Sequence, residues 1–109
     1  LRVGIEQGNT NAEEVKTGDG NGSNIFSASE IICIHRDDRL TRYCTTRGDY
    51  VQYITLTNAL KNLPKIFVRV NSNCIINRQH VKHYSRSTVT LDNGEVVKIG
   101  RPYKEEVFS

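Results

Sequence analysis

Long apolar stretches are scarce in this sequence. Only 37% of the 109 residues are hydrophobic, which is a low share for a globular chain. The longest apolar run extends only from Ile31 to Ile34, so the sequence shows neither a signal peptide nor a membrane span. We expect one domain over residues 1–109 with a modest core. A thin or two-sided sheet explains this composition better than a thick globule.

Cysteines are few, odd in number and irregularly spaced. Cys33, Cys44 and Cys74 cannot build a disulfide framework, and such a count favours a reducing compartment, here the cytoplasm. We expect Cys33 and Cys44 to pack inside strands because they lie in apolar or alternating runs. Cys74 lies beside a polar segment, where it is either reactive or, as most such cysteines are, inert.

The sequence also lacks a coherent catalytic set. Ser and His are present, but no nucleophile elbow or catalytic triad marks them. Asp37 and Asp38 are adjacent, so they cannot face one substrate together from a strand, and we expect a turn there. No Lys follows the Gly-rich segment 18–24 at the spacing of a Walker phosphate loop. We predict that the protein is not an enzyme and uses no cofactor.

The Gly-rich segment has a partial match to a calcium-binding loop. Asp19, Asn21, Ser23 and Glu30 occupy positions one, three, five and twelve of an EF-hand loop. Asn24, however, replaces the turn glycine, and the flanks have strand patterns where an EF-hand needs helices. The sequence therefore favours a hairpin loop over a calcium site.

Zinc is similarly disfavoured. His80 and His83 follow Cys74, but three-residue spacing on a strand places side chains on opposite faces, and no second ligand pair is present. We predict no metal site. The triplet Arg47-Gly48-Asp49 spells a cell-adhesion motif, but it is common by chance and fits a tight turn.

Strand patterns dominate the chain. Alternation over residues 1–6 and a continuous apolar run over 31–35 each predict a strand, and residues 24–27 can form a short strand that pairs back. A charged turn is expected at 36–39. Hairpins are expected for residues 40–46 with 50–55 and for 88–91 with 96–99, the second around Asp92-Asn93-Gly94. There is no internal repeat.

One short helix is expected before Pro64. Either Thr55 or Thr57 can cap its N-terminus, and the helix extends to Leu63, where Pro64 stops it. A second short turn can begin at Pro102, because proline suits a first helical position.

Positive charge is concentrated in the second half of the chain. Residues 65–109 hold eight Lys and Arg against four Asp and Glu, whereas residues 1–64 hold seven against eight. The same half contains a polar segment, Arg69, Asn71, Ser72 and Asn73, between apolar residues. Arg and Asn contact base edges and phosphates, so this distribution is compatible with nucleic-acid binding, although a solvated charged surface remains an alternative.

A series of motifs resembles the LytTR family of DNA-binding domains across most of the chain. The matching motifs, in order, are Phe67-x-Arg69, Ile75-Ile76-Asn77, Val81-Lys82-His83-Tyr84, Leu91-Asp92-Asn93-Gly94 and Gly100-Arg101-x-Tyr103. Two positions depart from the family pattern: Asn71 stands where the family usually has His, and Asn73 where it usually has Ser. These departures imply a base preference of this chain's own.

The resemblance implies a mostly β fold: an elongated arrangement of small antiparallel β-sheets with one short helix. It implies base contacts from three places, which correspond here to Arg39, to Asn71 with Ser72, and to Arg101. The first correspondence is loose, so Arg36 and Arg42 remain candidates. Asn77 matches a structural position. Further candidates for phosphate contacts are Arg69, Asn73, Arg78, Lys82, Arg86 and Lys104; for Arg69 a structural pairing is equally compatible with the pattern.

The function that the resemblance implies is sequence-specific binding of double-stranded DNA in transcription regulation. Loops would enter successive major grooves of bent DNA, and two copies would pair on direct repeats, with RNA polymerase as a further possible partner. Such domains are usually the output half of bacterial two-component response regulators that control virulence, bacteriocin production or quorum sensing. Because the chain opens on Leu1, we expect a C-terminal piece without its receiver domain, monomeric in isolation. The alternative is a small β protein-interaction module that binds no nucleic acid.

Overall fold

The computed structural model describes residues 14–18 and 23–109. The expected strand over residues 1–6 lies outside this part, as does most of the Gly-rich loop. The strands are β2 (Glu14–Gly18), β3 (Ser23–Ser27), β4 (Ile31–Asp37), β5 (Leu40–Thr45), β6 (Gly48–Gln52), β7 (Phe67–Asn71), β8 (Cys74–Asn77), β9 (Val81–Tyr84), β10 (Thr88–Leu91) and β11 (Val96–Lys98). The helices are α1 (Leu56–Lys61) and α2 (Lys104–Val107), with 3-10 helices at Ala28–Glu30, Arg78–His80 and Arg101–Tyr103.

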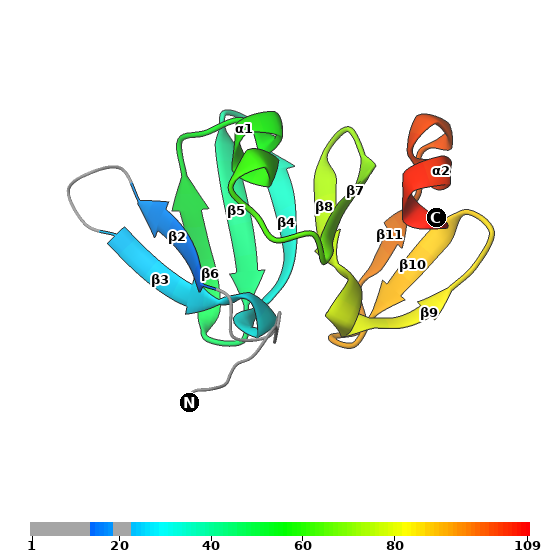
Figure 1. The fold of residues 1–109 in the computed structure, drawn as a ribbon, viewed down its shortest axis with the longest axis horizontal. Coiled ribbons are helices and arrows are strands. Elements are labelled where there is room, and N and C mark those ends of the chain that lie inside the picture. Colours follow the sequence, from blue (N-terminus) through cyan, green and yellow to red (C-terminus); the bar gives the residue numbers. More distant parts are fainter. Residues whose placement is uncertain (1–13, 19–22) are drawn as a thin grey trace.

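The described strands form three antiparallel sheets (Figure 1). A five-stranded sheet in the order β6-β5-β4-β8-β7 is the centre of the molecule, and the order β11-β10-β9 forms a three-stranded sheet. The hairpin β2-β3 forms the remaining sheet. The principal extents are 40 × 33 × 23 Å. This architecture confirms the predicted fold: small antiparallel β-sheets with little helix.

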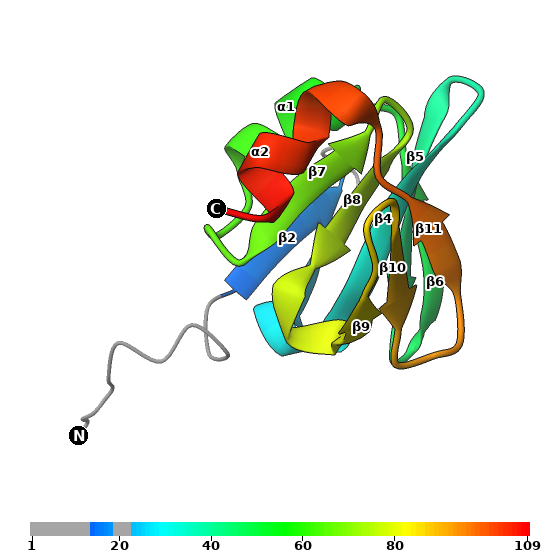
Figure 2. The same cartoon turned by 90° about the vertical axis from the view of Figure 1, so that its right-hand side faces the viewer.

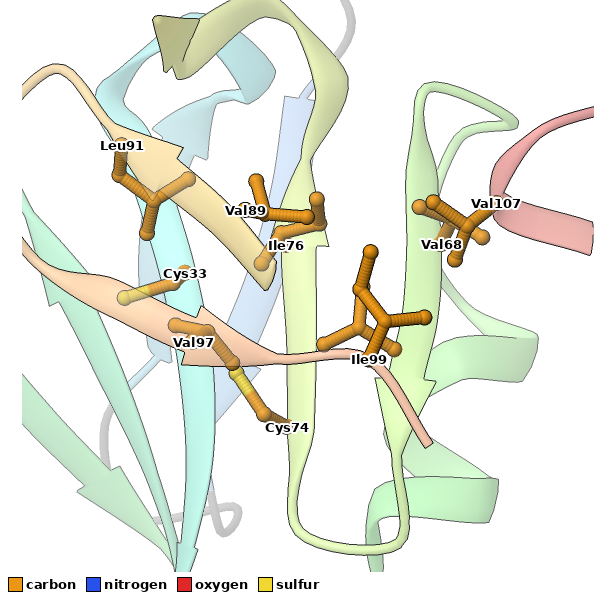
Figure 3. Packing of buried hydrophobic residues seen from close by; sticks show 10 residues of the cluster. Cys33, Val68, Cys74, Ile76, Val89, Leu91, Val97, Ile99 and Val107 are labelled. Atoms are coloured by element: carbon orange, nitrogen blue, oxygen red, sulfur yellow. The ribbon is translucent and has the colours of Figure 1, made fainter. Parts of the chain in front are cut away.

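Both faces of the five-stranded sheet are covered, which explains the continuous apolar run in β4. Ile31 and Ile34 pack on one face with the β2-β3 hairpin and α1, through Phe26 and Leu56. Cys33 belongs to the other face. The cluster there is formed by Cys33, Val68, Val70, Cys74, Ile76, Val89, Leu91, Val97, Ile99 and Val107 (Figure 3). A strand buried on both sides needs apolar residues in succession rather than in alternation.

The three-stranded sheet lies across the central one rather than continuing it. Figure 3 shows β11 and its continuation crossing the strands of the central sheet at a steep angle, with Val97 between Cys33 and Cys74, and Ile99 nearer Val68. Figure 2 shows the two sheets as separate layers, with α2 following from β11. Crossed layers bury one face of each sheet and bring the end of β11 to the end of β7.

Two tight turns are formed where the sequence predicted hairpins. Gly48 has φ +113° and Gly94 has φ +92°, conformations that residues with a Cβ rarely adopt. The first turn lies at residues 46–47, so Gly48 and Asp49 of the adhesion-like triplet already belong to β6. The second confirms the hairpin around Asp92-Asn93-Gly94.

Helix α1 is shorter than predicted. Thr55 caps it, because its hydroxyl accepts a hydrogen bond from the Asn58 N–H at 3.1 Å. The helix ends at Lys61 with Asn62 as its C-cap, and does not continue to Leu63. The cause is Pro64: the residue before a proline disfavours helical backbone, so the last turn unwinds ahead of it. The turn expected at Pro102 is present and leads into α2.

Asn77 is fully buried and structural, as its family position implied. Its Nδ2 donates to the main-chain oxygens of Ala28 at 3.0 Å and Ile31 at 2.9 Å, while its Oδ1 accepts from Gln79 N–H at 2.9 Å. One side chain thus joins β8 to the segment that precedes β4 and starts the next 3-10 helix.

Candidate nucleic-acid interface

Three segments that are far apart in the sequence meet at one edge of the molecule. They are the β4-β5 turn at 36–39, the β7-β8 turn at 71–73, and the end of β11 with its continuation at 98–101; we call them together the loop edge. Arg36 N–H donates to Asn73 O at 2.8 Å, and Gly100 N–H donates to Val70 O at 2.7 Å. In Figure 1 this edge lies at the top, where β4 and β11 end.

The β7-β8 turn is held in shape by side chains rather than by main-chain bonds alone. Asn71 uses both ends of its amide: Oδ1 accepts from Asn73 N–H at 2.7 Å, and Nδ2 donates to Lys98 O at 2.7 Å. A register irregularity between Arg69 and Asn71 accompanies the turn. Asn71 therefore ties the turn to β11, 27 residues away.

Arg69 supports the same turn from the other side. Its guanidinium donates to the main-chain oxygens of Ser72 at 2.9 Å and Asn71 at 3.3 Å, and to the Thr57 hydroxyl at 3.0 Å. It also lies 5.9 Å from the ring centroid of Tyr103. This arrangement is the structural pairing that the sequence left open for Arg69, and it joins the turn to α1.

Four exposed side chains project from this frame without a partner in the described part of the chain. Arg39, Ser72, Asn73 and Arg101 are exposed, and their side chains make no hydrogen bond or ion pair with any described residue. Free donors on a rigid turn suit recognition because no internal bond has to break before a ligand binds. Three of the four residues predicted to contact bases are in this group.

Arg36 and Arg42, the alternatives to Arg39, are already engaged. Arg36 Nε donates to Asp38 O at 3.3 Å. Arg42 pairs with Asp49 at 3.3 Å and lies 3.9 Å from Asp37. Burial lowers the Arg42 pKa, but Cys44 and these two carboxylates together outweigh it and raise the pKa. Arg39 is the arginine of this turn whose guanidinium is unengaged in the described structure.

Two hollows flank the β7-β8 turn. One is lined by Arg36, Arg39 and Arg69, by the acidic residue Asp38, and by residues of the segment that leads into α1. The other lies between the two sheets and is lined by residues 71–74 on one side and 95–100 on the other. Three arginines and one aspartate line the first hollow, so its lining carries an excess of positive charge, which favours an anionic group.

The predicted phosphate contacts are dispersed. Asn73 belongs to the loop edge and Arg69 supports its β7-β8 turn. Arg78 instead donates to the main-chain oxygens of Val107 at 2.9 Å and Glu106 at 2.8 Å and thereby caps α2. Lys82 is exposed on β9, two strands from β11. Lys104 begins α2 and is half-buried, and Arg86 is exposed between β9 and β10. Their DNA contacts stay predictions.

The residues weighed for reactivity or zinc do not come together. Cys74 is 2% exposed, and burial raises the pKa of its thiol to about 12, so it is the inert alternative. His80 lies in a 3-10 helix and not in the predicted strand. Its ring nitrogens contact Asp92 at 2.7 Å and Ser29 O at 2.6 Å. His83 stands apart on β9.

The carboxylate at the twelfth position of the candidate calcium loop is engaged elsewhere. Glu30 accepts the Ser27 N–H at 2.8 Å and pairs with Arg47 at 2.9 Å, so its carboxylate caps a 3-10 helix and braces a turn. The described flanks are the strands of the β2-β3 hairpin. Asp19 and Asn21 lie outside the described residues.

Sequence reasoning missed a cluster of ligand-type side chains at one end of β11. Cys33, His35, Cys44 and Glu95 bring their ligand atoms within 4.8 Å of one another. Cys33 and His35 are two residues apart on β4, so the strand period places them on one face, which was a usable signal. Nothing in the sequence indicated Glu95, because only the crossing of the two sheets brings it there.

Free polar side chains on the loops of a rigid β-sheet are typical of a domain that binds a partner through its loops. Comparison with known proteins identifies the family. The model of the family described as LytTr DNA-binding domain matches residues 22–109. The chain therefore belongs to the LytTR family of DNA-binding domains, which are not enzymes. Its fold is similar to a LytTr DNA-binding domain of a methyl-accepting/DNA response regulator from Bacillus cereus. That comparison has a TM-score of 0.72 at 23% identity and covers 86% of this chain and 92% of the other.

No curated protein sequence matches the chain. Within the described ranges, no helix is long and apolar enough to cross a membrane.

Proposed function

We propose that this chain regulates transcription by binding a specific sequence of double-stranded DNA through the loop edge. The observation that carries the proposal is the meeting of three distant segments with free polar side chains at one edge, in a chain of the LytTR family. Membership accounts for DNA as the partner. The geometry supports the choice of the edge by which it binds.

The proposed mechanism divides the loop edge into a frame and contact groups. Asn71 and Arg69 hold the β7-β8 turn, and Ser72 and Asn73 meet the base edges or phosphates of one major groove. Asn71 reaches a base only if its amide leaves Lys98 O, so its predicted base contact ranks behind Ser72. Arg101, at the far end of β11, contacts the adjacent groove.

Arg39 provides the third contact, from the β4-β5 turn. With Arg36 and Arg69 around the neighbouring hollow, it favours a phosphate between the two grooves. Contacts in successive grooves favour bent DNA, and the energy of bending adds sequence preference at bases that no side chain touches. Lys82, Lys104, Arg78 and Arg86 contribute long-range attraction rather than positioning.

We propose further that the domain works as the cytoplasmic output half of a two-component response regulator. Two copies would bind direct repeats as a homodimer on DNA and contact RNA polymerase, while the isolated domain stays monomeric. Quorum sensing and virulence are the processes that the family resemblance suggests for such a regulator.

The test is a binding titration by fluorescence anisotropy with a duplex selected from a random library. Arg101→Ala and Asn73→Ala should each weaken binding to the selected duplex by roughly 10–100-fold, the loss expected for one bidentate base contact. Lys82→Ala, two strands away, should change binding several-fold at most. Affinity for the wild type should fall steeply with salt.

Two results would contradict the proposed DNA binding through the loop edge. If the folded wild type binds no duplex at low salt, the proposal is wrong and the alternative, a β protein-interaction module, takes its place. Equal losses for Lys82→Ala and Arg101→Ala would show general charge attraction and contradict recognition by the loop edge.

A further inference from the structure

Four side chains of metal-ligand type converge where the two crossed sheets meet. Cys33 and His35 come from β4, Cys44 from β5, and Glu95 from the turn that leads into β11. Cys33 and Cys44 are directly paired across the strands, so their side chains share one face. His35, two residues from Cys33, points the same way.

The distances within this cluster suit one small cation. Cys33 Sγ lies 3.4 Å from His35 Nε2 and 3.8 Å from Glu95 Oε1. Ligand atoms around tetrahedral Zn²⁺ are separated by about 3.4–3.8 Å, given Zn–S near 2.3 Å and Zn–N or Zn–O near 2.1 Å. His35 Nε2 and Glu95 Oε2 are closer, at 2.6 Å, and share a hydrogen-bonding contact that a bound cation would replace.

The surroundings hold Cys33 in a dry setting and leave the other three ligands partly exposed. Cys33 is 1% exposed and packs with the aliphatic side chains of Val89, Leu91 and Val97. The backbone of Glu95 is held on both sides, since its N–H donates to Asn93 Oδ1 at 2.9 Å and its oxygen accepts from Leu91 N–H at 2.8 Å. Preorganised ligands with a hydrophobic shell favour tight metal binding.

We propose that Cys33, His35, Cys44 and Glu95 form a binding site for a thiophilic divalent cation, of which Zn²⁺ is the best match. Two thiolates, one imidazole and one carboxylate are all ligands that Zn²⁺ accepts, and four of them complete a tetrahedral, structural site. Arg42, which pairs with His35 across the strands, brings a positive charge to the ligands' side of the sheet and shares it with Asp49 and Asp37.

The bound cation would fasten the start of β11 to β4 and β5. The other end of β11 is already fastened, because Lys98 O accepts the Asn71 amide and Gly100 N–H donates to Val70 O. The site therefore sets the position of the strand that leads to the loop edge. The inference stands on the ligand geometry alone, so it can fail or succeed independently of DNA binding.

The first experiment is a titration of the reduced protein with Co²⁺, a spectroscopic substitute for Zn²⁺, in the presence of a phosphine reductant. We expect one Co²⁺ per chain, the visible bands of a tetrahedral ion and a thiolate-to-cobalt charge-transfer band, all displaced by Zn²⁺. Cys44→Ser should weaken affinity by at least about 100-fold, beyond the 10–100-fold effect typical of an outer-shell partner, and reduce the charge-transfer band. Glu95→Gln should weaken affinity about 10-fold or more.

Matched controls use the same residue types outside the cluster. Cys74→Ala and His83→Ala should bind Co²⁺ as the wild type does. A folded wild type without the tetrahedral spectrum would overturn the proposal, as would a wild-type spectrum and affinity in Cys44→Ser, or equal losses in Cys74→Ala.

A second readout remains usable if a variant folds poorly. In the wild type, stoichiometric Zn²⁺ should slow alkylation of the half-buried Cys44 by at least 10-fold, because a metal-bound thiolate is a weaker nucleophile. It should also raise the melting temperature, since the ion binds only the folded chain. Unchanged alkylation and melting at saturating Zn²⁺ would contradict the site.

Discussion

The side-chain amide of Asn71 donates a 2.7 Å hydrogen bond to the main-chain oxygen of Lys98. This bond joins the turn of the central sheet to the crossing strand of the other sheet. Two of the segments expected to contact DNA are thus fixed relative to each other by one side chain, at the position where the chain departs from the family's usual histidine.

Substitutions of Asn71 should distinguish the contributions of its two side-chain hydrogen bonds. Asn71→Asp keeps the acceptor for Asn73 N–H but loses the donor to Lys98 O, whereas Asn71→Ala loses both. We expect unfolding free energies lower by about 1 kcal/mol for Asp and about 1–2 kcal/mol for Ala, with weaker DNA binding in both. Chemical denaturation and anisotropy titrations check this. Weak DNA binding without any loss of stability would mean that Asn71 contacts a base directly rather than framing the turn.

Asn77 should be among the most sensitive polar positions. Asn77→Ala leaves the buried oxygens of Ala28 and Ile31 without their donor, and each unsatisfied buried group is costly. We expect a loss of about 2–4 kcal/mol in urea denaturation. The control Asn62→Ala removes an exposed amide at the end of α1 and should change stability by less than about 0.5 kcal/mol. Similar effects for both variants would contradict the role of Asn77.

The sequence allows either Thr55 or Thr57 as the N-cap of α1, and stability measurements should distinguish the two. Thr55 caps α1, so Thr55→Ala should lower stability by about 1 kcal/mol. Thr57 instead accepts a hydrogen bond from Arg69, so Thr57→Ala should leave stability within about 0.5 kcal/mol and weaken DNA binding through a looser turn. Thermal melts and DNA titrations of the pair provide the check, and a reversed order of stability would place the cap at Thr57.

Stability should fall at alkaline pH because buried groups, among them Cys74 and Tyr43, resist ionisation. Burial raises the pKa of Cys74 from 9.0 to about 12 and that of Tyr43 from 10.0 to about 12. Between these values the unfolded chain has lost the proton and the folded chain has kept it. The unfolded state then binds fewer protons, so the unfolding free energy decreases as pH rises through this window.

Urea denaturation at about pH 8 and about pH 10.5 measures this decline. Cys74→Ala should decline less steeply between the two pH values, although it starts from a lower stability because a buried side chain is truncated. An identical slope in the variant would show that Cys74 ionises as readily in the folded chain as in the unfolded one.

Much of the local structure followed from the sequence because its causes are local. The turn at Asn93-Gly94 needs a residue that tolerates positive φ, and Gly94 at φ +92° supplies it. The run at 31–35 needs burial on both faces, and it is the central strand. Helix α1 ends two residues before the position that its sequence pattern predicts, because Pro64 disfavours helical backbone in the residue before it.

The order of residues along the chain by itself determined most of the strands, their turns, the family and the segments that carry polar and basic side chains, because pleat period, turn conformation and charge depend on neighbouring residues. It did not predict β2, and it extended β6 to residue 55 although this strand ends at Gln52. Which side chains are free and which are engaged was decided only by the tertiary structure. Arg69 and Asn71 look like contact residues in the sequence, but bonds to Thr57 and Lys98 make them parts of the frame. The convergence of Glu95 with Cys33, His35 and Cys44 has the same origin, since it exists only because one sheet packs across another.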